Sequence, residues 1–234
     1  MSSEPLRPRT GIRVKTAPGA VIFDLDGTLI DSSEGIKWAM AKSLERVRPD
    51  LSRTPFSPQI GPPIAAIFSA CLPGLGEAEI AALAAEFRRH YDHEGVFRCS
   101  PYEGATELLT ALAQVGRCRL FVLTNKPASA TEPLLRHLNW DGFFSAVYAP
   151  EKHTASRQFK ATVLPRLIER HAIDPKGAFY VGDTREDMEA ARQGGLNFVH
   201  AAYGFGPSQL EAACRITALT ELRSHLLPAL HHDR

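Results

Sequence analysis

The sequence predicts an α/β fold: a doubly wound, parallel-sheet core of the Rossmann-like kind into which an α-helical segment is inserted. Three observations predict this fold. The first is a short apolar run at 20–23. The second is that 32–98 shows helical periodicity without any strand pattern. The third is that, after 98, short apolar runs alternate with helical patterns. Such alternation is typical of parallel strands joined by helical crossovers, because a parallel sheet is covered by helices on both faces.

The first predicted strand, 20–23, leads into a segment in which we expect only helices. From 33 to about 47, apolar residues recur at helical spacing with charged residues between them. A proline-rich loop follows as far as Pro63. The runs IAAIFSACL (64–72) and EAEIAALAAEFRRHYDHEG (77–95) predict two further helices.

These patterns divide the chain into three parts. Residues 1–19 carry Arg, Lys, Pro and Ser without a long apolar run, so we expect a flexible N-terminal extension rather than a secretory signal. Residues 20–31 and 99–234 are expected to form the α/β catalytic core. Residues 32–98 are expected to form a helical cap inserted into that core.

Beyond the insert, helices and strands alternate regularly. The expected order is helix 104–116, strand 118–125, helix 129–140, strand 145–150, helix 160–173, strand 177–183, helix 185–195 and strand 196–202. Right-handed crossovers between parallel strands bring their carboxyl ends to one edge of the sheet, where the ligand sites of α/β proteins lie. The residues that follow each strand are therefore the candidates for function.

Composition argues against several classes of partner. Lys and Arg together number 27 against 26 Asp and Glu, so net charge gives no sign of binding to nucleic acid or to an anionic membrane. No apolar run approaches the roughly 20 residues of a membrane-spanning helix. The four cysteines lack the paired spacing of zinc or redox sites. We expect a cytoplasmic protein, a monomer or homodimer, with neither nucleic-acid nor membrane partners.

Four segments follow predicted strands: DLDGT (24–28), TNK (124–126), APEKH (149–153) and GDTREDM (182–188). Each alone is more often a turn than a site. Together they bring carboxylates to one crevice, where the charges would repel one another unless a cation neutralised them. Oxygen ligands without nearby His or Cys suit a hard ion, and Mg²⁺ pairs with carboxylates and substrate phosphate.

The segments DLDGTLIDS, VLTNK and VGDTREDMEAA resemble, in order and separation, the motifs of the haloacid dehalogenase-like (HAD) hydrolase superfamily. The resemblance extends from Ala20 to about Gly206. The helical insert after the first motif is similar to the members with a helical cap. Within these, IGPPI and PYEG (101–104) resemble a subgroup of phosphoglycolate phosphatases and 5′-nucleotidase-like enzymes.

The resemblance implies roles that also make chemical sense. Asp24 would attack phosphorus and form an aspartyl phosphate. Asp26 would protonate the leaving oxygen and later activate water. Gly27 would permit a tight turn near the phosphate oxygens, and Thr124 with Asn125 would hydrogen-bond the phosphoryl group.

The same resemblance implies a magnesium site. Asp183 would bind Mg²⁺ together with the carboxylate of Asp24 and the carbonyl of Asp26. Asp187, one helical turn further along, would bind the ion directly or through water.

A lysine is expected to balance the charge between nucleophile and phosphate. The family often shows Lys-Pro after its third motif, and this chain has no such pair there. Lys160, at the start of a predicted helix, is the preferred candidate, and Lys152 is its rival. Lys126 is interpreted as a solvated charge in a loop.

On the insert, Gly61, Pro62 and Pro63 form either a rigid loop that faces the substrate or only the start of a helix. Both interpretations stay open, and Gly61 and Pro62 are carried as candidate substrate-binding residues.

The resemblance implies Mg²⁺-dependent hydrolysis of a small phosphorylated metabolite, of the phosphoglycolate phosphatase or 5′-nucleotidase kind. Two alternatives stay open. One is a phosphoryl-transferring sugar-phosphate mutase of the β-phosphoglucomutase kind, which would use Asp24 and Asp26 similarly. The other is a non-catalytic, phosphate-binding regulator, although the simplest sign of lost activity, replacement of either aspartate, is not seen.

Overall fold

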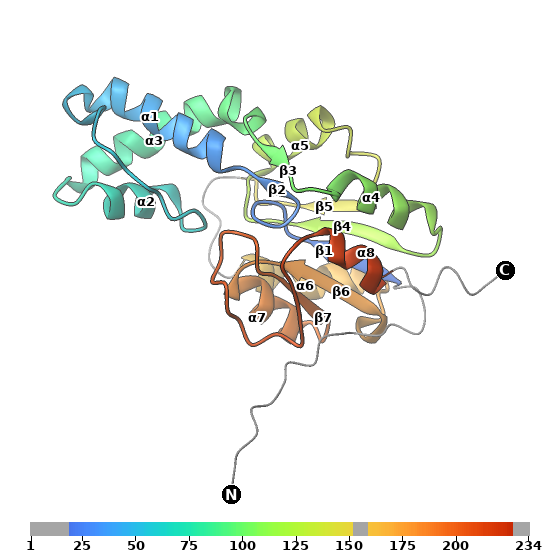
Figure 1. Ribbon diagram of the computed structural model, residues 1–234. Coiled ribbons are helices and arrows are strands. Elements are labelled where there is room, and N and C mark those ends of the chain that lie inside the picture. Colours follow the sequence, from blue (N-terminus) through green and yellow to red (C-terminus); the bar gives the residue numbers. More distant parts are fainter. Residues whose placement is uncertain (1–18, 152–158, 227–234) are drawn as a thin grey trace, which may run out of the picture.

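A computed structural model of the protein describes residues 19–151 and 159–226. Its centre is a six-stranded parallel sheet in the order β5-β4-β1-β6-β7-β8 (Figure 1). The strands are β1 (Ala20–Phe23), β4 (Arg119–Leu123), β5 (Ala146–Tyr148), β6 (Ala178–Gly182), β7 (Asn197–Ala201) and β8 (Cys214–Ile216). The predicted doubly wound parallel sheet is confirmed.

Strand β1 lies at the point where the strand order reverses. From β1 the chain moves to β4 and β5 on one side, and then to β6, β7 and β8 on the other. In sheets of this kind, the crevice beyond the carboxyl ends of the strands at the reversal is where ligands bind. Asp24, the residue directly after β1, therefore lies at the edge of the sheet where such ligands bind.

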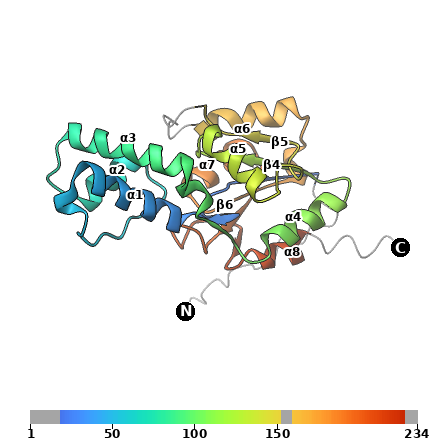
Figure 2. The same ribbon diagram turned by 90° about the horizontal axis from the view of Figure 1, so that it is seen from above.

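Helices cover both faces of the sheet (Figure 2). One face packs against α4 (Ala105–Gln114), α5 (Ala128–His137) and α8 (Thr220–Leu226), and the other against α6 (Phe159–Arg170) and α7 (Arg185–Gln193). Side chains alternate along β1, so Val21 and Phe23 join the first hydrophobic cluster while Ala20 and Ile22 join the second. This two-sided burial explains why the predicted strands are mostly apolar.

The inserted segment contains α1 (Ser33–Val47), α2 (Ile64–Cys71) and α3 (Glu77–His93), which lie together at one end of the molecule (Figure 1). Phe68 of α2 meets Phe87 of α3 edge to face, with ring centroids 6.5 Å apart. A short antiparallel pair, β2 (Ile30–Asp31) with β3 (Ser100–Pro101), joins the entry and exit of the segment. Two residues per strand are too few to give a periodic signal, so this pair was not predicted.

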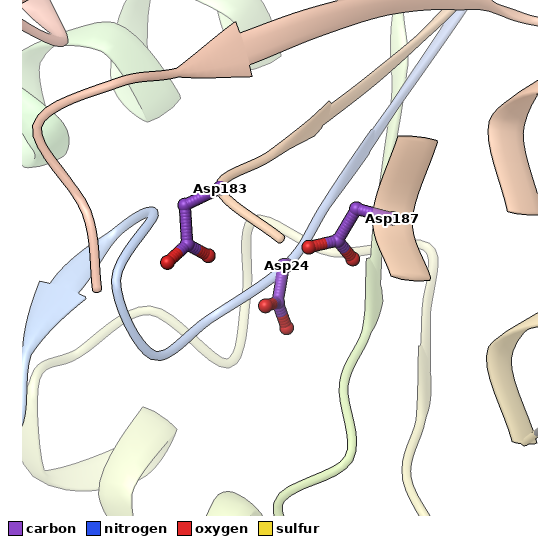
Figure 3. Close-up of side chains that lie close together, drawn as sticks. All are labelled: Asp24, Asp183 and Asp187. Carbon is purple, nitrogen blue, oxygen red and sulfur yellow. The ribbon is translucent and has the colours of Figure 1, made fainter. Parts of the chain in front are cut away.

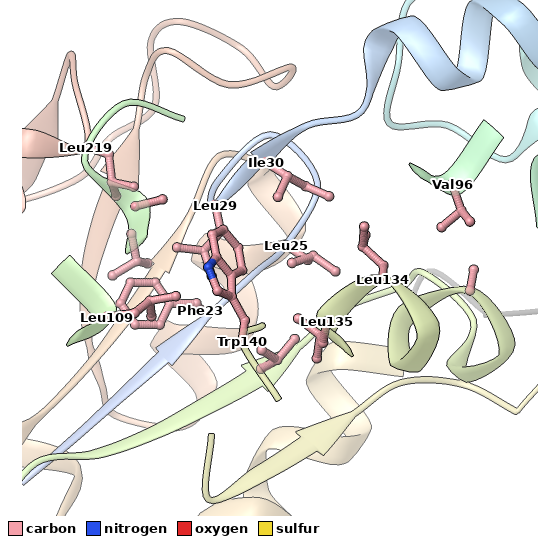
Figure 4. Close-up of a cluster of buried hydrophobic side chains, with 14 of the residues drawn as sticks. Phe23, Leu25, Leu29, Ile30, Val96, Leu109, Leu134, Leu135, Trp140 and Leu219 are labelled. Atoms are coloured by element: carbon pink, nitrogen blue, oxygen red, sulfur yellow. The ribbon is translucent and has the colours of Figure 1, made fainter. Parts of the chain in front are cut away.

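One hydrophobic cluster extends from the sheet towards the inserted helices (Figure 4). Phe23 of β1 is followed by Leu25 and Leu29, and these lie among Leu134 of α5 and the buried ring of Trp140. The same cluster includes Met40 and Phe68 of the insert. The helical segment therefore shares apolar packing with one face of the core.

The remaining elements are short. They are three 3₁₀ turns, η1 (Pro49–Leu51), η2 (Gly95–Phe97) and η3 (Pro175–Gly177). Strand β8 and helix α8 extend the core beyond the elements predicted from the sequence. The described residues include no helix with the length and apolar character needed to cross a membrane.

Candidate active site

Three carboxylates converge at the carboxyl edge of the sheet (Figure 3). Asp24 follows β1, Asp183 follows β6, and Asp187 lies in the first turn of α7. One oxygen from each lies within 4.8 Å of the others, and all three side chains are buried. The structure therefore brings together three of the four aspartates that the sequence placed at one site.

Asp183 is held by a loop that follows β7. Its Oδ2 accepts hydrogen bonds from the backbone N–H groups of Phe205, at 2.8 Å, and Gly206, at 2.9 Å. Gly27 passes so close that an added Cβ would lie 2.4 Å from Asp183 Oδ2, and its φ is +81°. Glycine at 27 is thus required both by the backbone conformation and by the approach to this carboxylate.

Asp187 has hydrogen-bond donors on both of its oxygens. Oδ1 accepts from Lys160 at 2.7 Å and from the hydroxyl of Tyr180 at 2.9 Å. Oδ2 accepts from the backbone N–H and the hydroxyl of Thr184, in a capping box that starts α7. With four donors, this carboxylate has its hydrogen-bonding capacity largely filled. It is therefore suited to orienting Lys160 and to contacting an ion through water.

Lys160 lies on α6 with its ammonium 2.9 Å from Asp24 Oδ2 and 2.7 Å from Asp187 Oδ1. Burial lowers the pKa of Lys160, but Asp187 and Asp24 more than offset this, so the net pKa is raised and the group stays charged. The structure places the ammonium of Lys160 beside Asp24, and its charge-balancing role stays a prediction. Its rival, Lys152, lies outside the described residues.

The electrostatics of the cluster favour a further cation. Burial raises the pKa of Asp24 well above its usual range, despite Lys160, and burial together with Asp187 raises the pKa of Asp183 to about 6. Asp24 Oδ1 is buried and has no hydrogen-bond partner among the described residues. Three carboxylates lie beside one lysine, and one of their oxygens, Asp24 Oδ1, lacks a donor among the described residues. This arrangement fits the oxygen ligands that Mg²⁺ prefers.

Thr124 and Asn125 follow β4 beside β1. The register aligns Phe23 with Val122, which brings these two residues to the same edge as Asp24. Thr124 is buried, and its hydroxyl accepts from the backbone N–H of Lys126 at 3.2 Å. Asn125 Nδ2 donates to Glu186 Oε2 at 2.9 Å, a contact that fixes the amide beside α7.

The interpretation of Lys126 as a solvated loop charge is wrong. Its side chain is buried, and Nζ donates to Asp26 Oδ1 at 3.1 Å and to the hydroxyl of Tyr91 at 2.5 Å. The sequence interpretation failed because Tyr91 comes from α3, far away in the chain. The carboxylate of Asp26 thus faces Lys126 and does not belong to the cluster of Asp24, Asp183 and Asp187. The Asp26 atom expected to bind a metal ion is accordingly its backbone carbonyl oxygen.

Gly61 and Pro62 are exposed in the turn before α2. Gly61 has a φ of +124°, and an added Cβ there would meet open space. Within the described ranges, no backbone–backbone hydrogen bond joins either residue to the loops after the strands. The structure does not bring them into the cluster, and their predicted role in substrate binding stays a prediction.

Several residues of the site were not foreseen from the sequence. Tyr180 supports Asp187 from within β6, where it is indistinguishable from a core aromatic residue. The 204–206 loop holds Asp183, and its signal was available: Gly204 and Gly206 follow a predicted strand at the same edge. An added Cβ on Gly204 would lie 2.4 Å from Asp183 Cβ, so the loop can approach only with glycine there.

Comparison with known proteins identifies a family. The sequence profile described as "Haloacid dehalogenase-like hydrolase" matches residues 21–201. A 5′-nucleotidase of Pseudomonas aeruginosa is 31% identical over 189 residues, which cover 80% of this chain and 83% of the relative. A phosphoglycolate phosphatase of Rhodospirillum rubrum is 34% identical over 199 residues, covering 80% and 81%. The structure of protein tyrosine kinase A of Mycobacterium tuberculosis superposes with a TM-score of 0.73 at 29% identity, covering 90% of this chain and 99% of that one.

Proposed function

The chain belongs to the haloacid dehalogenase-like hydrolase family, and from this we propose that it hydrolyses a small phosphomonoester in two steps through Asp24. Relatives named as phosphoglycolate phosphatases and as a 5′-nucleotidase, which match most of the chain, support a phosphatase. The observation that carries the proposal is the contact between Asp24 Oδ2 and Lys160, with Asp24 Oδ1 left without a hydrogen-bond partner among the described residues.

In the first step, a carboxylate oxygen of Asp24 attacks phosphorus. The bond between phosphorus and the ester oxygen breaks, and the departing alcohol takes a proton from Asp26. Lys160 stabilises the negative charge that gathers between the carboxylate and the phosphoryl oxygens. Thr124 and Asn125, at the same edge of the sheet, are proposed to hydrogen-bond those oxygens.

In the second step, water replaces the alcohol. Asp26 takes a proton from the water, whose oxygen bonds to phosphorus, and the bond to Asp24 breaks to release inorganic phosphate. Both aspartates end the cycle in the state in which they began it. The separation of Asp24 and Asp26 by one residue places both at the same turn after β1.

The residues that would hold Mg²⁺ are Asp24 and Asp183 by their carboxylates and Asp26 by its carbonyl. When bound, the ion would neutralise the carboxylates and the substrate phosphate. Asp187, whose oxygens each already accept hydrogen bonds, is proposed to act through Lys160 or through water.

The helical segment is proposed to be a cap that closes over the strand ends and shapes the pocket for the leaving alcohol. Its helices lie beside the carboxyl edge of β1 (Figure 1), and closure of such a segment would exclude water from the phosphoryl group. The substrate is accordingly proposed to be a small phosphorylated metabolite of the phosphoglycolate or nucleoside monophosphate class, to which the named relatives point.

The test is a screen of phosphomonoesters with Mg²⁺, with a chelator, and with the Asp24→Asn variant. We expect phosphate release from at least one aliphatic ester, and loss of that release both with the chelator and in the variant. Release of phosphate by Asp24→Asn at the parent rate would overturn the proposal. A phosphorylated acceptor formed without phosphate release would instead indicate phosphoryl transfer, the activity named for the mycobacterial relative.

A further inference from the structure

A chain of contacts joins the inserted helices to the acid–base group of the core. Lys126 Nζ lies 3.1 Å from Asp26 Oδ1 and 3.3 Å from Asp26 Oδ2, so it bridges both oxygens. On its other side, the same ammonium donates to the hydroxyl of Tyr91 at 2.5 Å and lies 4.7 Å from the centre of the tyrosine ring. The three residues come from the loop after β1, the loop after β4 and α3.

In addition to these two side-chain contacts, the backbone of Lys126 is held by residues of the core. Its backbone N–H donates to Thr124 Oγ1 at 3.2 Å, and its carbonyl accepts from Thr131 Oγ1 at 3.1 Å. Burial lowers the pKa of Lys126, but Asp26 and Tyr91 more than offset this, so the net pKa is raised and the ammonium stays charged. A buried charge of this kind must keep its partners, because a lost partner leaves it unpaired.

Tyr91 is equally constrained from the side of the insert. Its ring stacks on Phe87, with centroids 5.1 Å apart and planes 12° from parallel. Burial raises the pKa of Tyr91 to about 12, so the phenol is neutral and its oxygen accepts from the ammonium. The position of this oxygen is therefore set by the packing of α3, and Asp26, which is a quarter exposed, is the least constrained of the three side chains.

We propose that Tyr91 is a positioning residue: through its contact with Lys126 it holds the side chain of Asp26 in place, so that the acid–base group is organised only when the helical segment is closed. The inference rests on the proposed function, because it assigns a role to Asp26. It predicts that Tyr91 matters for departure of the alcohol and much less for attack at phosphorus, since only the former needs the proton of Asp26.

The test compares esters that differ in their need for that proton. Aliphatic alcohols leave poorly without a proton, whereas p-nitrophenolate leaves unaided. The probes are 2-phosphoglycolate, uridine 5′-monophosphate and glucose 6-phosphate on one side, and p-nitrophenyl phosphate on the other. The measured quantity is kcat/KM, which reports the steps up to cleavage of the ester and excludes the later hydrolysis.

The variants are Tyr91→Phe, which keeps the ring and removes the hydroxyl, Lys126→Met, and the two combined. We expect Tyr91→Phe to lower kcat/KM about tenfold for the best aliphatic ester, and at most about twofold for p-nitrophenyl phosphate. Lys126→Met should lower the aliphatic value by about 10²-fold, and the double variant should match it, because Tyr91 acts through Lys126.

Tyr148→Phe is the matched control. It also loses a tyrosine hydroxyl contact, here with His171 Nε2 at 3.0 Å, away from the contacts of Asp26. Its kcat/KM ratio between the two kinds of ester should equal that of the parent. Circular dichroism melting of every variant checks that Tyr91→Phe is folded at the assay temperature.

Equal losses on both kinds of ester would overturn the inference and reduce Tyr91 to a packing residue. So would a double variant whose losses multiply. These outcomes leave the phosphatase assignment intact, because the parent enzyme is active in both. An inactive parent on every ester would instead refute the proposed function, and the inference with it.

Discussion

The two buried lysines of the site mark two differently built regions. Lys160, 2% exposed, lies between Asp24 and Asp187, and both of these partners belong to the α/β core. Lys126, 7% exposed, lies between Asp26 and Tyr91, and one of its partners belongs to the inserted helices.

The difference separates the two halves of the proposed reaction. The group proposed to contact the phosphoryl group, Lys160, has both of its carboxylate partners in the core. The group proposed to serve the leaving alcohol, Asp26, is joined through Lys126 to Tyr91 of α3. A family that keeps its core and varies its cap would thereby keep the attack at phosphorus while changing the alcohol that it accepts.

Removal of the core lysine is expected to lower the rate on every kind of ester. Lys160→Ala should lower kcat/KM by about 10²-fold, roughly 3 kcal/mol, on every ester including p-nitrophenyl phosphate, since lost charge stabilisation affects attack at phosphorus itself. Lys152→Ala, the matched control, should cost less. A greater loss in Lys152→Ala would transfer the role to that residue, and a loss confined to aliphatic esters would erase the contrast between the two lysines.

The metal response should belong to the core region as well. Mg²⁺ at about 100 times its dissociation constant should stabilise the parent by about 2.7 kcal/mol, since binding favours the folded state. Asp183→Asn should lose most of the resulting rise in Tm and require at least about tenfold more Mg²⁺ for the half-maximal rate. Asp174→Asn, which alters an exposed turn, is the control. An unchanged rate in the presence of a chelator would contradict the metal site.

The smallest and most selective effect is expected on the insert. Pro62→Ala should change the ranking of aliphatic esters by a few-fold in kcat/KM and leave p-nitrophenyl phosphate within about twofold, because a loop that faces the alcohol affects specificity and not the core chemistry. A profile over several esters is the measurement. A uniform fall across all esters would show that this loop only supports the fold, and an unchanged profile would locate specificity elsewhere.

The same contrast explains what could be predicted from the sequence. Asp24 and Asp183 were predicted to lie together because each follows a strand in a regular α/β alternation, and topology brings those positions to one edge. The need for a lysine came from the family resemblance, and Lys160 was preferred to Lys152 because it opens a predicted helix. Strand β8 was not predicted, because its three residues have an exposed arginine, Arg215, at their centre and give no apolar run.

Lys126 was misjudged for a different reason. Its surroundings depend on Tyr91, and the local sequence pattern indicates only that Tyr91 is an aromatic side chain on the apolar face of a helix. Burial of a loop charge is a property of long-range packing, which no local pattern reports. The strand-end residues of the core side were therefore predicted, whereas Tyr180, the 204–206 loop and the link to the insert were not.

The central claim is that the phosphoryl group passes through Asp24, and it can be tested by trapping. The Asp26→Asn variant, in which hydrolysis of the intermediate should be slow, is mixed with p-nitrophenyl phosphate, quenched and reduced with borohydride, which converts an acyl phosphate to an alcohol. Peptide mass spectrometry then locates the reduced residue. We predict reduction at Asp24 in proportion to the p-nitrophenol released, and none in Asp24→Asn. A burst of p-nitrophenol with Asp24 unmodified would contradict the account.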